Sequence, residues 1–164
     1  MLDRKLLSIY LNDHLAGSTI GLELSRRARG SNKGSAYGEV LERVAKEIEE
    51  DRETLQRLMS DLGVRRDHPK VTAAWVAEKF GRLKPNGRLL SYSPLSRLVE
   101  LEALALGISG KLSLWEALTE VAGEDARLDL DELRRLAGRA ERQRKEVWQV
   151  RQRAARDAFA APAS

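Results

Sequence analysis

The stretch that decides the fold is residues 36–63, which read AYGEVLERVAKEIEEDRETLQRLMSDLG. Its apolar residues recur at alternating steps of three and four, which places them on one face of an α-helix. This face contains Leu41, Val44, Ile48, Leu55, Leu58 and Leu62, interrupted by the strongly polar Asp51. Gly63 follows as a common helix stop. We therefore predict an amphipathic helix over about residues 36–62, with Ser35 as its N-cap.

Three further helices are predicted over about residues 3–29, 93–121 and 129–158. Their first residues carry start signals: Asp3, the pair Ser93-Pro94, and the capping-box pattern Asp129-x-x-Glu132. The connections within the first and second pairs of helices are short, so each pair should form an antiparallel hairpin. We expect one all-α domain over residues 1–158 and a frayed tail over residues 159–164.

About 30 residues separate the second and third helices, and they contain a short helical stretch over residues 69–80. A helix of about 27 residues is about 40 Å long. The connection is long enough to cross that distance, so the third helix can begin at the same end as the second. We therefore predict a four-helix bundle with a long crossover that carries a short helix.

The composition excludes several classes of protein. Of 164 residues, 42% are hydrophobic, which is sufficient for a packed core, and none is cysteine. The absence of cysteine excludes a disulfide scaffold, thiolate metal sites and Cys-based catalysis. No stretch approaches 18 uncharged apolar residues, and the N-terminus lacks a signal-peptide pattern. We expect a soluble cytoplasmic protein with no membrane segment.

Each predicted helix carries a polar residue near its middle. These are His14, Asp51 and Gln143 on the first, second and fourth helices, and Glu102 within the largely apolar third helix. Counting residues from the helix ends places His14, Asp51 and Gln143 at the same height along the bundle axis. Ser109 is the residue of the third helix at that height. Glu102 should lie about 10 Å higher, within reach of Arg151 or Arg144.

Two interpretations of these residues are open. A buried polar group without a partner is costly, so residues on facing helices at one level should form a hydrogen-bonded network. The favoured interpretation is a structural polar layer built around a His14–Asp51 hydrogen bond. The alternative is a metal site with His14, Asp51, Glu102 and Glu47 as ligands, since such side chains hold metals inside helix bundles.

The helix order, the long crossover and the mid-bundle polar layer resemble the ferritin-like superfamily over most of residues 2–158. Its di-iron members place Glu-x-x-His on two of the four helices. The nearest patterns here are Glu47-x-x-Glu50 and Glu141-x-x-Arg144, and neither supplies the histidine. The resemblance therefore implies a non-catalytic, self-associating bundle without a conventional di-iron centre. No cofactor is expected, and the alternative is an oxidoreductase with iron or manganese.

The fourth helix is strongly basic, with nine Lys or Arg against two Glu over residues 134–156. A surface with Arg139, Arg142, Arg151 and Arg153 could bind nucleic acid or an acidic partner. This alternative is disfavoured because aromatic residues for base stacking are scarce there. Acidic residues of the second helix also compensate the charge.

Two smaller features concern packing. Trp148 lies off the apolar face of its helix, so it should be covered by the crossover, through Trp75 and Phe80, or by a second subunit in a homodimer. Gly17-x-x-x-Gly21 on the first helix allows either close helix packing, which is the favoured interpretation, or room for a bulky neighbour or a small ligand.

Overall fold

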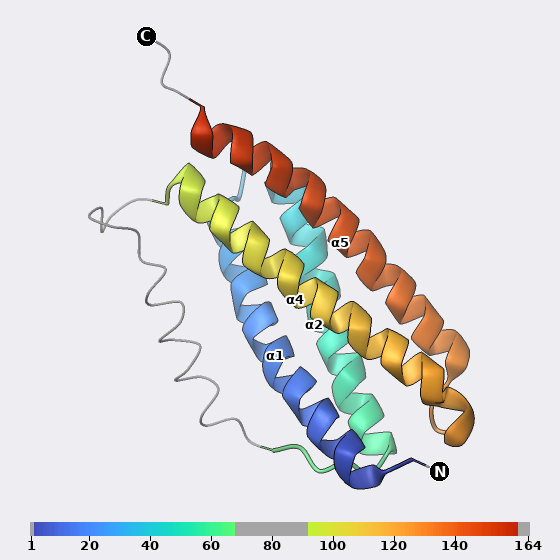
Figure 1. The fold of residues 1–164 in the computed structure, drawn as a ribbon. Helices are drawn as coiled ribbons and strands as arrows, with labels where there is room; N and C mark the ends of the chain where they lie inside the picture. Colours follow the sequence, from blue (N-terminus) through green and yellow to red (C-terminus); the bar gives the residue numbers. More distant parts are fainter. Residues whose placement is uncertain (1, 68–91, 161–164) are drawn as a thin grey trace.

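The computed structural model describes residues 2–67 and 92–160, and the regular structure within these ranges is helical. Its four long helices are α1 (Arg4–Ser31), α2 (Gly38–Asp61), α4 (Pro94–Val121) and α5 (Leu130–Phe159), with a short 3₁₀ turn, η1 (Ala122–Glu124), after α4. α1 and α2 form one antiparallel pair and α4 and α5 a second, and α4 also packs against α1 (Figure 1). The predicted all-α four-helix bundle is confirmed.

The sequence signals at the helix starts act as caps in three of the four cases. Asp3 accepts hydrogen bonds from the backbone N–H of Lys5 and of Leu6, at 2.9 and 3.1 Å. Ser93 and Asp129 cap α4 and α5 in the same way. Each side-chain oxygen satisfies backbone donors that the first helical turn leaves unpaired.

The start of α2 corrects the prediction that Ser35 is its N-cap. The helix begins at Gly38, and the capping position is occupied by Tyr37, whose side chain makes no cap bond. The Ser35 hydroxyl donates to the Asn32 carbonyl, at 2.7 Å, inside the preceding turn. Gly34 has a φ of 73° in this turn, a conformation that favours glycine. The turn therefore extends two residues further than expected.

The start of α4 lies against the turn between α1 and α2. The Asn32 side chain donates to the Tyr92 hydroxyl at 2.8 Å and accepts from Arg97 Nε at 2.6 Å. α4 therefore begins at the end of the bundle where α2 also begins (Figure 1). The chain between α2 and α4 must join opposite ends. The predicted short helix over residues 69–80, and with it Trp75 and Phe80, lies outside the described residues.

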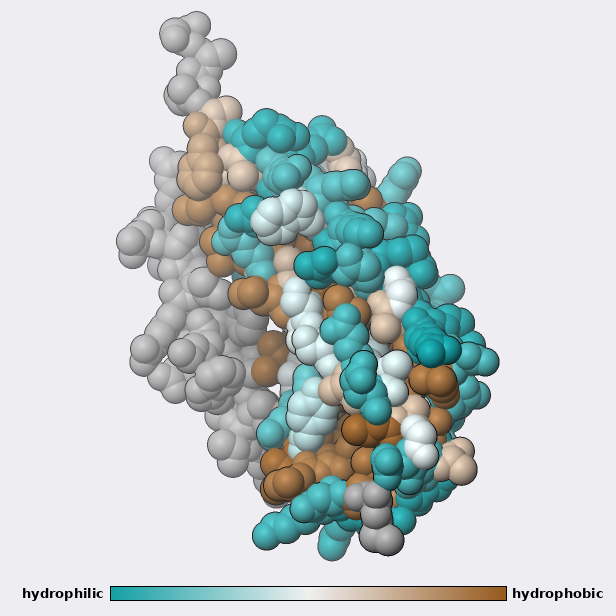
Figure 2. Space-filling model, turned by 45° about the vertical axis from the view of Figure 1, so that its right-hand side comes forward, coloured by the Kyte–Doolittle hydropathy of each residue, from teal (hydrophilic) through white to brown (hydrophobic). Residues whose placement is uncertain are grey.

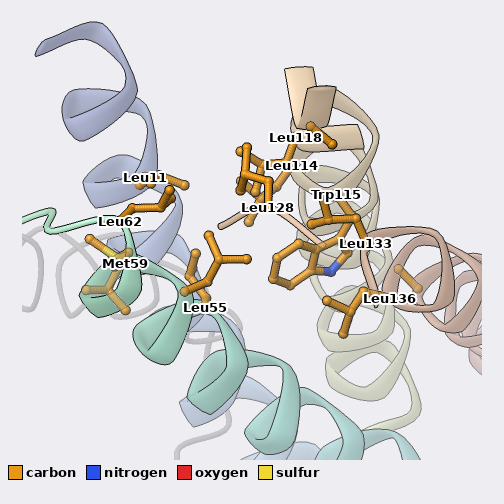
Figure 3. Packing of buried hydrophobic residues seen from close by; sticks show 14 residues of the cluster. Leu11, Leu55, Met59, Leu62, Leu114, Trp115, Leu118, Leu128, Leu133 and Leu136 are labelled. Carbon is orange, nitrogen blue, oxygen red and sulfur yellow. The ribbon is translucent and has the colours of Figure 1, made fainter. Parts of the chain in front are cut away.

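The apolar core consists of two clusters, one toward each end of the bundle. The cluster near η1 is built around Trp115, whose indole points into the space among Leu55 of α2 and Leu133 and Leu136 of α5 (Figure 3). The other cluster packs Leu41 and neighbouring α2 residues against the first half of α4 and the last turns of α5. Core residues of α2 lie on both sides of Asp51, so a polar residue stands where the two clusters meet.

The described surface is mostly hydrophilic, with some apolar side chains exposed. Figure 2 shows hydrophilic residues over most of the described surface in its view, with hydrophobic residues along the left-hand edge and at the lower end. Among the described residues, the large apolar side chains that are exposed are Leu6, Ile9, Leu95, Leu106, Leu130, Trp148 and Phe159. Within residues 2–67 and 92–160, no helix is long and apolar enough to span a membrane.

Candidate functional site

A layer of polar side chains separates the two apolar clusters. Asp51 of α2 and Gln143 of α5 are fully buried, and Lys111 of α4 reaches between them. The Lys111 ammonium donates to Asp51 Oδ2 and to Gln143 Oε1. The Gln143 amide donates in turn to Asp51 Oδ2, at 3.3 Å. Three helices are thus joined by one buried network.

The Lys111 ammonium lies in an environment that disfavours its charge. Its side chain is 15% exposed. Burial lowers its pKa, and the Asp51 carboxylate opposes this by stabilising the charged form. Removing an ammonium group from water costs roughly several kcal/mol, unless nearby polar groups compensate for the lost hydration. The contacts with Asp51 and Gln143 supply that compensation and hold the ammonium at one position.

The network continues toward the α2–α5 side of the bundle. Arg139 donates to Asp51 Oδ1 and, at 3.0 Å, to Glu50. The Gln143 amide also donates to Glu47, at 2.8 Å. Arg139 and Glu47 line a cavity of about 530 Å³ between α2 and α5 whose walls are mainly charged. With Arg139 on Oδ1 and Lys111 on Oδ2, both oxygens of the Asp51 carboxylate accept hydrogen bonds.

The structure brings Asp51 and Gln143 together but does not bring His14 to them. Asp51 is 13 residues after the first residue of α2, and the residue 13 before the end of α1 is Ser18. The neighbouring Thr19 accepts a hydrogen bond from Arg52 at 3.4 Å. The expected level was wrong because α1 ends two residues later, and α2 begins two residues later, than predicted.

His14 and Ser109 have other surroundings. The His14 ring makes an edge contact with Tyr10, with 4.5 Å between the ring centres, and no hydrogen bond to Asp51 is present in the described structure. Burial lowers the pKa of His14, partly opposed by Asp13. The Ser109 hydroxyl donates to the Ala105 carbonyl of its own helix, at 2.9 Å. Neither residue takes part in the polar layer.

Sequence reasoning missed Lys111, the residue that α4 contributes to the layer. α4 is apolar almost all round, so hydropathy alone does not show which of its faces is buried. A usable signal is present nevertheless, because Lys111 is the sole charged residue between Glu102 and Glu116. Its neighbours one turn away, Ile108 and Leu114, are both buried. A lone charge in such surroundings indicates a buried partner.

A pocket of about 570 Å³ opens between α1 and α4, on the other side of the polar layer. Asp51 and Lys111 form part of its wall. Most of the remaining wall is apolar and comes from three helices, with Leu24 on α1, Ile48 on α2 and Ile108 on α4 among its residues. Binding sites for small molecules have this size and composition, with mainly apolar walls and a few polar groups.

Glycines on both facing helices create the space for this pocket. Gly17 and Gly21 line it from α1, and Gly107 and Gly110 line it from α4. A Cβ atom added at any of the four would meet no atom of the described structure within 4 Å, apart from its own helix backbone and chain neighbours. Gly17-x-x-x-Gly21 thus leaves room rather than allowing close helix packing, contrary to the favoured interpretation of the sequence.

Two residues that line the pocket carry hydrogen-bond donors without a partner. They are the Arg52 Nε–H and the indole N–H of Trp115, both of which are buried and unpaired among the described residues. Buried polar groups are nearly always paired in folded proteins. Because the indole nitrogen of Trp115 lies beside Leu133 of α5 (Figure 3), the unused donor that this pocket offers is the Arg52 Nε–H.

The four residues proposed as metal ligands are not assembled into a site. Asp51 binds Lys111 and Arg139, and Glu47 accepts from Gln143. Glu102 lies on the face toward α5, where Arg151 donates to it at 2.6 and 3.1 Å. Among residues 2–67 and 92–160, no group of three or more His, Asp or Glu side chains could hold a metal ion.

The four arginines proposed as a basic binding face have different surroundings, and their role in binding stays a prediction. Arg139 points to Asp51 and Glu50, as described above. The Arg151 guanidinium, besides pairing with Glu102, lies over the Trp148 ring at 4.7 Å. Arg153 lies over the Tyr37 ring at 5.5 Å, and Arg142 remains exposed. Trp148 is 51% exposed in the single chain, and its cover by Trp75 and Phe80, which lie outside the described residues, or by a second subunit stays a prediction.

A second buried carboxylate lies at the end of the bundle where α4 begins. This carboxylate belongs to Glu100, which is only 6% exposed. It accepts from the Tyr92 hydroxyl at 2.9 Å and forms an ion pair with Arg27 at 2.8 Å. Burial raises the pKa of Glu100, while these two partners oppose the shift. Burial also raises the pKa of Tyr92 to about 12.

No protein-family model matches the chain, and comparisons with curated proteins and with solved structures give no match either. The class that the fold and the site define is a four-helix bundle with a central polar layer and an apolar pocket beside it.

Proposed function

We propose that this chain is a non-catalytic four-helix bundle that binds a small, mainly apolar molecule in the pocket between α1 and α4. The observation that carries the proposal is the pocket of about 570 Å³ whose facing walls each contain two glycines with open space beside them. Its volume lies within the range of roughly 300–1,000 Å³ that is common for ligand sites.

Packing energetics support this function over a structural role for the space. Protein interiors are close-packed, and empty volume forfeits contacts between atoms. Glycine within a helix also costs roughly 0.5–1 kcal/mol relative to alanine. A bundle filled only by its own side chains would gain stability from larger residues at these four positions. A bound molecule makes use of the space instead.

We also propose that the helices are connected as in ferritin-like bundles and that the interior holds no di-metal centre. It is supported by the position of the start of α4 beside the α1–α2 turn, held by Asn32. The residues facing the bundle interior at mid-height also include a lysine, Lys111, which would repel a cation beside Asp51. These features suit a bundle whose interior holds an organic molecule rather than metal ions.

Self-association is also part of the proposal. The exposed Leu6 and Ile9 lie three residues apart near the start of α1, at 63% and 51% exposure. Apolar side chains at this spacing share a helix face. Light scattering of the purified protein should give about twice the chain mass, and Leu6→Glu with Ile9→Lys should restore the monomer mass. A monomer at every concentration would exclude self-association.

The test of ligand binding uses Trp115, which lines the pocket, as the reporter. The chain has three tryptophans, so the variant W75F/W148F leaves Trp115 as the sole indole. Titration with 1-decanol, a neutral apolar probe, should change its fluorescence in a saturable manner.

Blocking variants locate the binding. Gly21→Leu and Gly110→Leu place side chains in the pocket and should abolish the decanol response, while thermal denaturation shows that they remain folded. Gly138→Leu is the matched control, because Gly138 also has open space beside it but lies on α5 outside the pocket. An unchanged response in both blocked variants would refute the proposed site.

A further inference from the structure

We infer that the natural ligand of the α1–α4 pocket carries a carboxylate, and that Arg52 and Lys111 are the residues that bind this group. The inference rests on the proposed function, since it assigns the chemical class of the molecule in that same pocket. Its evidence is a comparison of the hydrogen-bond acceptors in the pocket wall, which already have partners, with the donors, some of which do not.

Each acceptor oxygen of Asp51 and Gln143 in the polar layer already accepts at least one hydrogen bond. Asp51 Oδ1 accepts from Arg139, and Oδ2 accepts from Lys111 and Gln143. The Gln143 carbonyl oxygen accepts from Lys111. Each of these three oxygens thus already has a cationic or amide donor beside it, and a ligand amine would have to share an oxygen with that donor.

The donors of the pocket wall are not exhausted. A lysine ammonium has three N–H groups, and Lys111 uses two of them on Asp51 and Gln143. The third remains for a ligand. Because an ionised donor forms stronger hydrogen bonds with a carboxylate than with a neutral oxygen, an acidic head group gains most from this position.

Arg52 provides the second cationic donor. It is half-buried, and its one hydrogen bond within the described structure is a long one, 3.4 Å, to Thr19. Its buried Nε–H has no hydrogen-bond partner among the described residues. An arginine that lines an apolar pocket in this state matches a carboxylate, which the planar guanidinium can bind through two N–H groups.

The remaining polar groups of the pocket do not reverse this preference. Asp13 is the other acidic residue of the wall, but it is exposed, so water screens its charge. Burial lowers the pKa of His14, which favours its neutral form, and the nearby Asp13 partly opposes this shift. The indole nitrogen of Trp115 lies beside Leu133 of α5 (Figure 3), so this N–H is not counted among the donors for the head group. An amine head group would meet Arg52 and Lys111 as like charges.

The experiment compares three probes with the same ten-carbon chain: decanoate, 1-decanol and decylamine. Each is titrated below its micelle concentration into the W75F/W148F protein at pH 7.5, with Trp115 fluorescence as the readout. Decanoate should bind at least about tenfold more tightly than decanol, and decylamine more weakly than decanol. This difference corresponds to one charge-assisted hydrogen bond.

Arg52→Gln should weaken decanoate binding about tenfold and leave decanol binding unchanged. Arg142→Gln, an exposed arginine outside the pocket, is the matched control and should change neither. Equal binding of decanol and decanoate, with no effect of Arg52→Gln, would overturn the carboxylate inference and leave the proposed pocket function intact. Absence of a response to both probes would instead overturn the proposed function. Arg52 is the better test position than Lys111, because substitution of Lys111 also disturbs Asp51.

Discussion

Asp51 is the residue on which the interior of this bundle depends. It is 2% exposed and accepts hydrogen bonds from Lys111, Arg139 and Gln143. An isolated carboxylate in this position would be costly, and the surrounding donors remove most of that cost. Its stability contribution is therefore coupled to its partners and cannot be assigned to Asp51 alone.

Lys111→Met should lower the free energy of unfolding by about 2–4 kcal/mol, because it removes one partner of a buried ion pair. In the double variant Asp51→Leu/Lys111→Met the loss should be at least about 1 kcal/mol smaller than the sum of the two single losses. Urea denaturation measures all three values. Lys46→Met, at an exposed lysine of α2, is the control. Strictly additive losses would contradict the buried pair.

Glu100 should make stability depend on pH in a defined direction. Burial raises its pKa in the folded protein above the ordinary value near 4.5. The folded state therefore binds the proton more tightly than the unfolded state, and stability is lost as the pH rises through the folded pKa. Relative to Glu100→Gln, the wild-type protein should be most stable near pH 4 and lose this advantage toward pH 7.

Urea denaturation at several pH values measures the difference between these two proteins. Glu116→Gln, at an exposed residue of the same helix, should show no such trend. A wild-type to Glu100→Gln difference that stays constant from pH 4 to pH 7 would show that burial of Glu100 does not shift its titration.

At the residue scale, the sequence predicts that a polar layer crosses the bundle, but it identifies only some of the residues in that layer. Asp51 and Gln143 are recognisable because each interrupts an otherwise regular apolar face. Lys111 was missed because its helix has no polar face for comparison, and His14 was placed at the wrong level. A shift of two residues at helix ends is sufficient to exchange one partner for another one turn away.

At the scale of the elements, the sequence predicts the buried face most reliably for the amphipathic helices. Seven predicted positions of α2, from Leu41 to Leu62, are all buried. The caps at Asp3, Ser93 and Asp129 fix three helix starts, whereas the start of α2 depends on how the 32–37 turn folds. α1 differs most from expectation, because its glycine-containing face borders a pocket rather than packing against a neighbouring helix.

The pocket-lining glycines should reduce the stability of their helices. Gly17→Ala, Gly21→Ala, Gly107→Ala and Gly110→Ala should each raise the free energy of unfolding by roughly 0.5–1 kcal/mol, because alanine favours the helix and its Cβ meets open space. Gly138→Ala on α5 is the reference for helix propensity alone. Thermal or urea denaturation measures each value.

The opposite result is expected at Gly38. A Cβ atom there would lie 3.0 Å from the Asn32 carbonyl oxygen, so Gly38→Ala should destabilise the protein. Destabilisation at the four pocket positions as well would show that helices approach each other there, and would contradict the pocket.

At the scale of the whole molecule, three features coincide at mid-height of the bundle. The two apolar clusters meet there, the polar layer crosses from α4 through α2 to α5, and the α1–α4 pocket opens beside it. Hydropathy patterns predict the number, length and order of the helices. They do not predict an interior cavity, because a cavity depends on the absence of side chains from two helices that are distant in sequence.

The most direct test of a ligand pocket between α1 and α4 uses the four isoleucines of the chain. Ile20, Ile48 and Ile108 line the pocket, whereas Ile9 is exposed elsewhere on α1. With selectively labelled isoleucine methyl groups and added decanoate, intermolecular nuclear Overhauser effects should connect the decanoate chain to the three pocket isoleucines and not to Ile9. Contacts to Ile9 alone, or to none of the four, would contradict the pocket as the binding site.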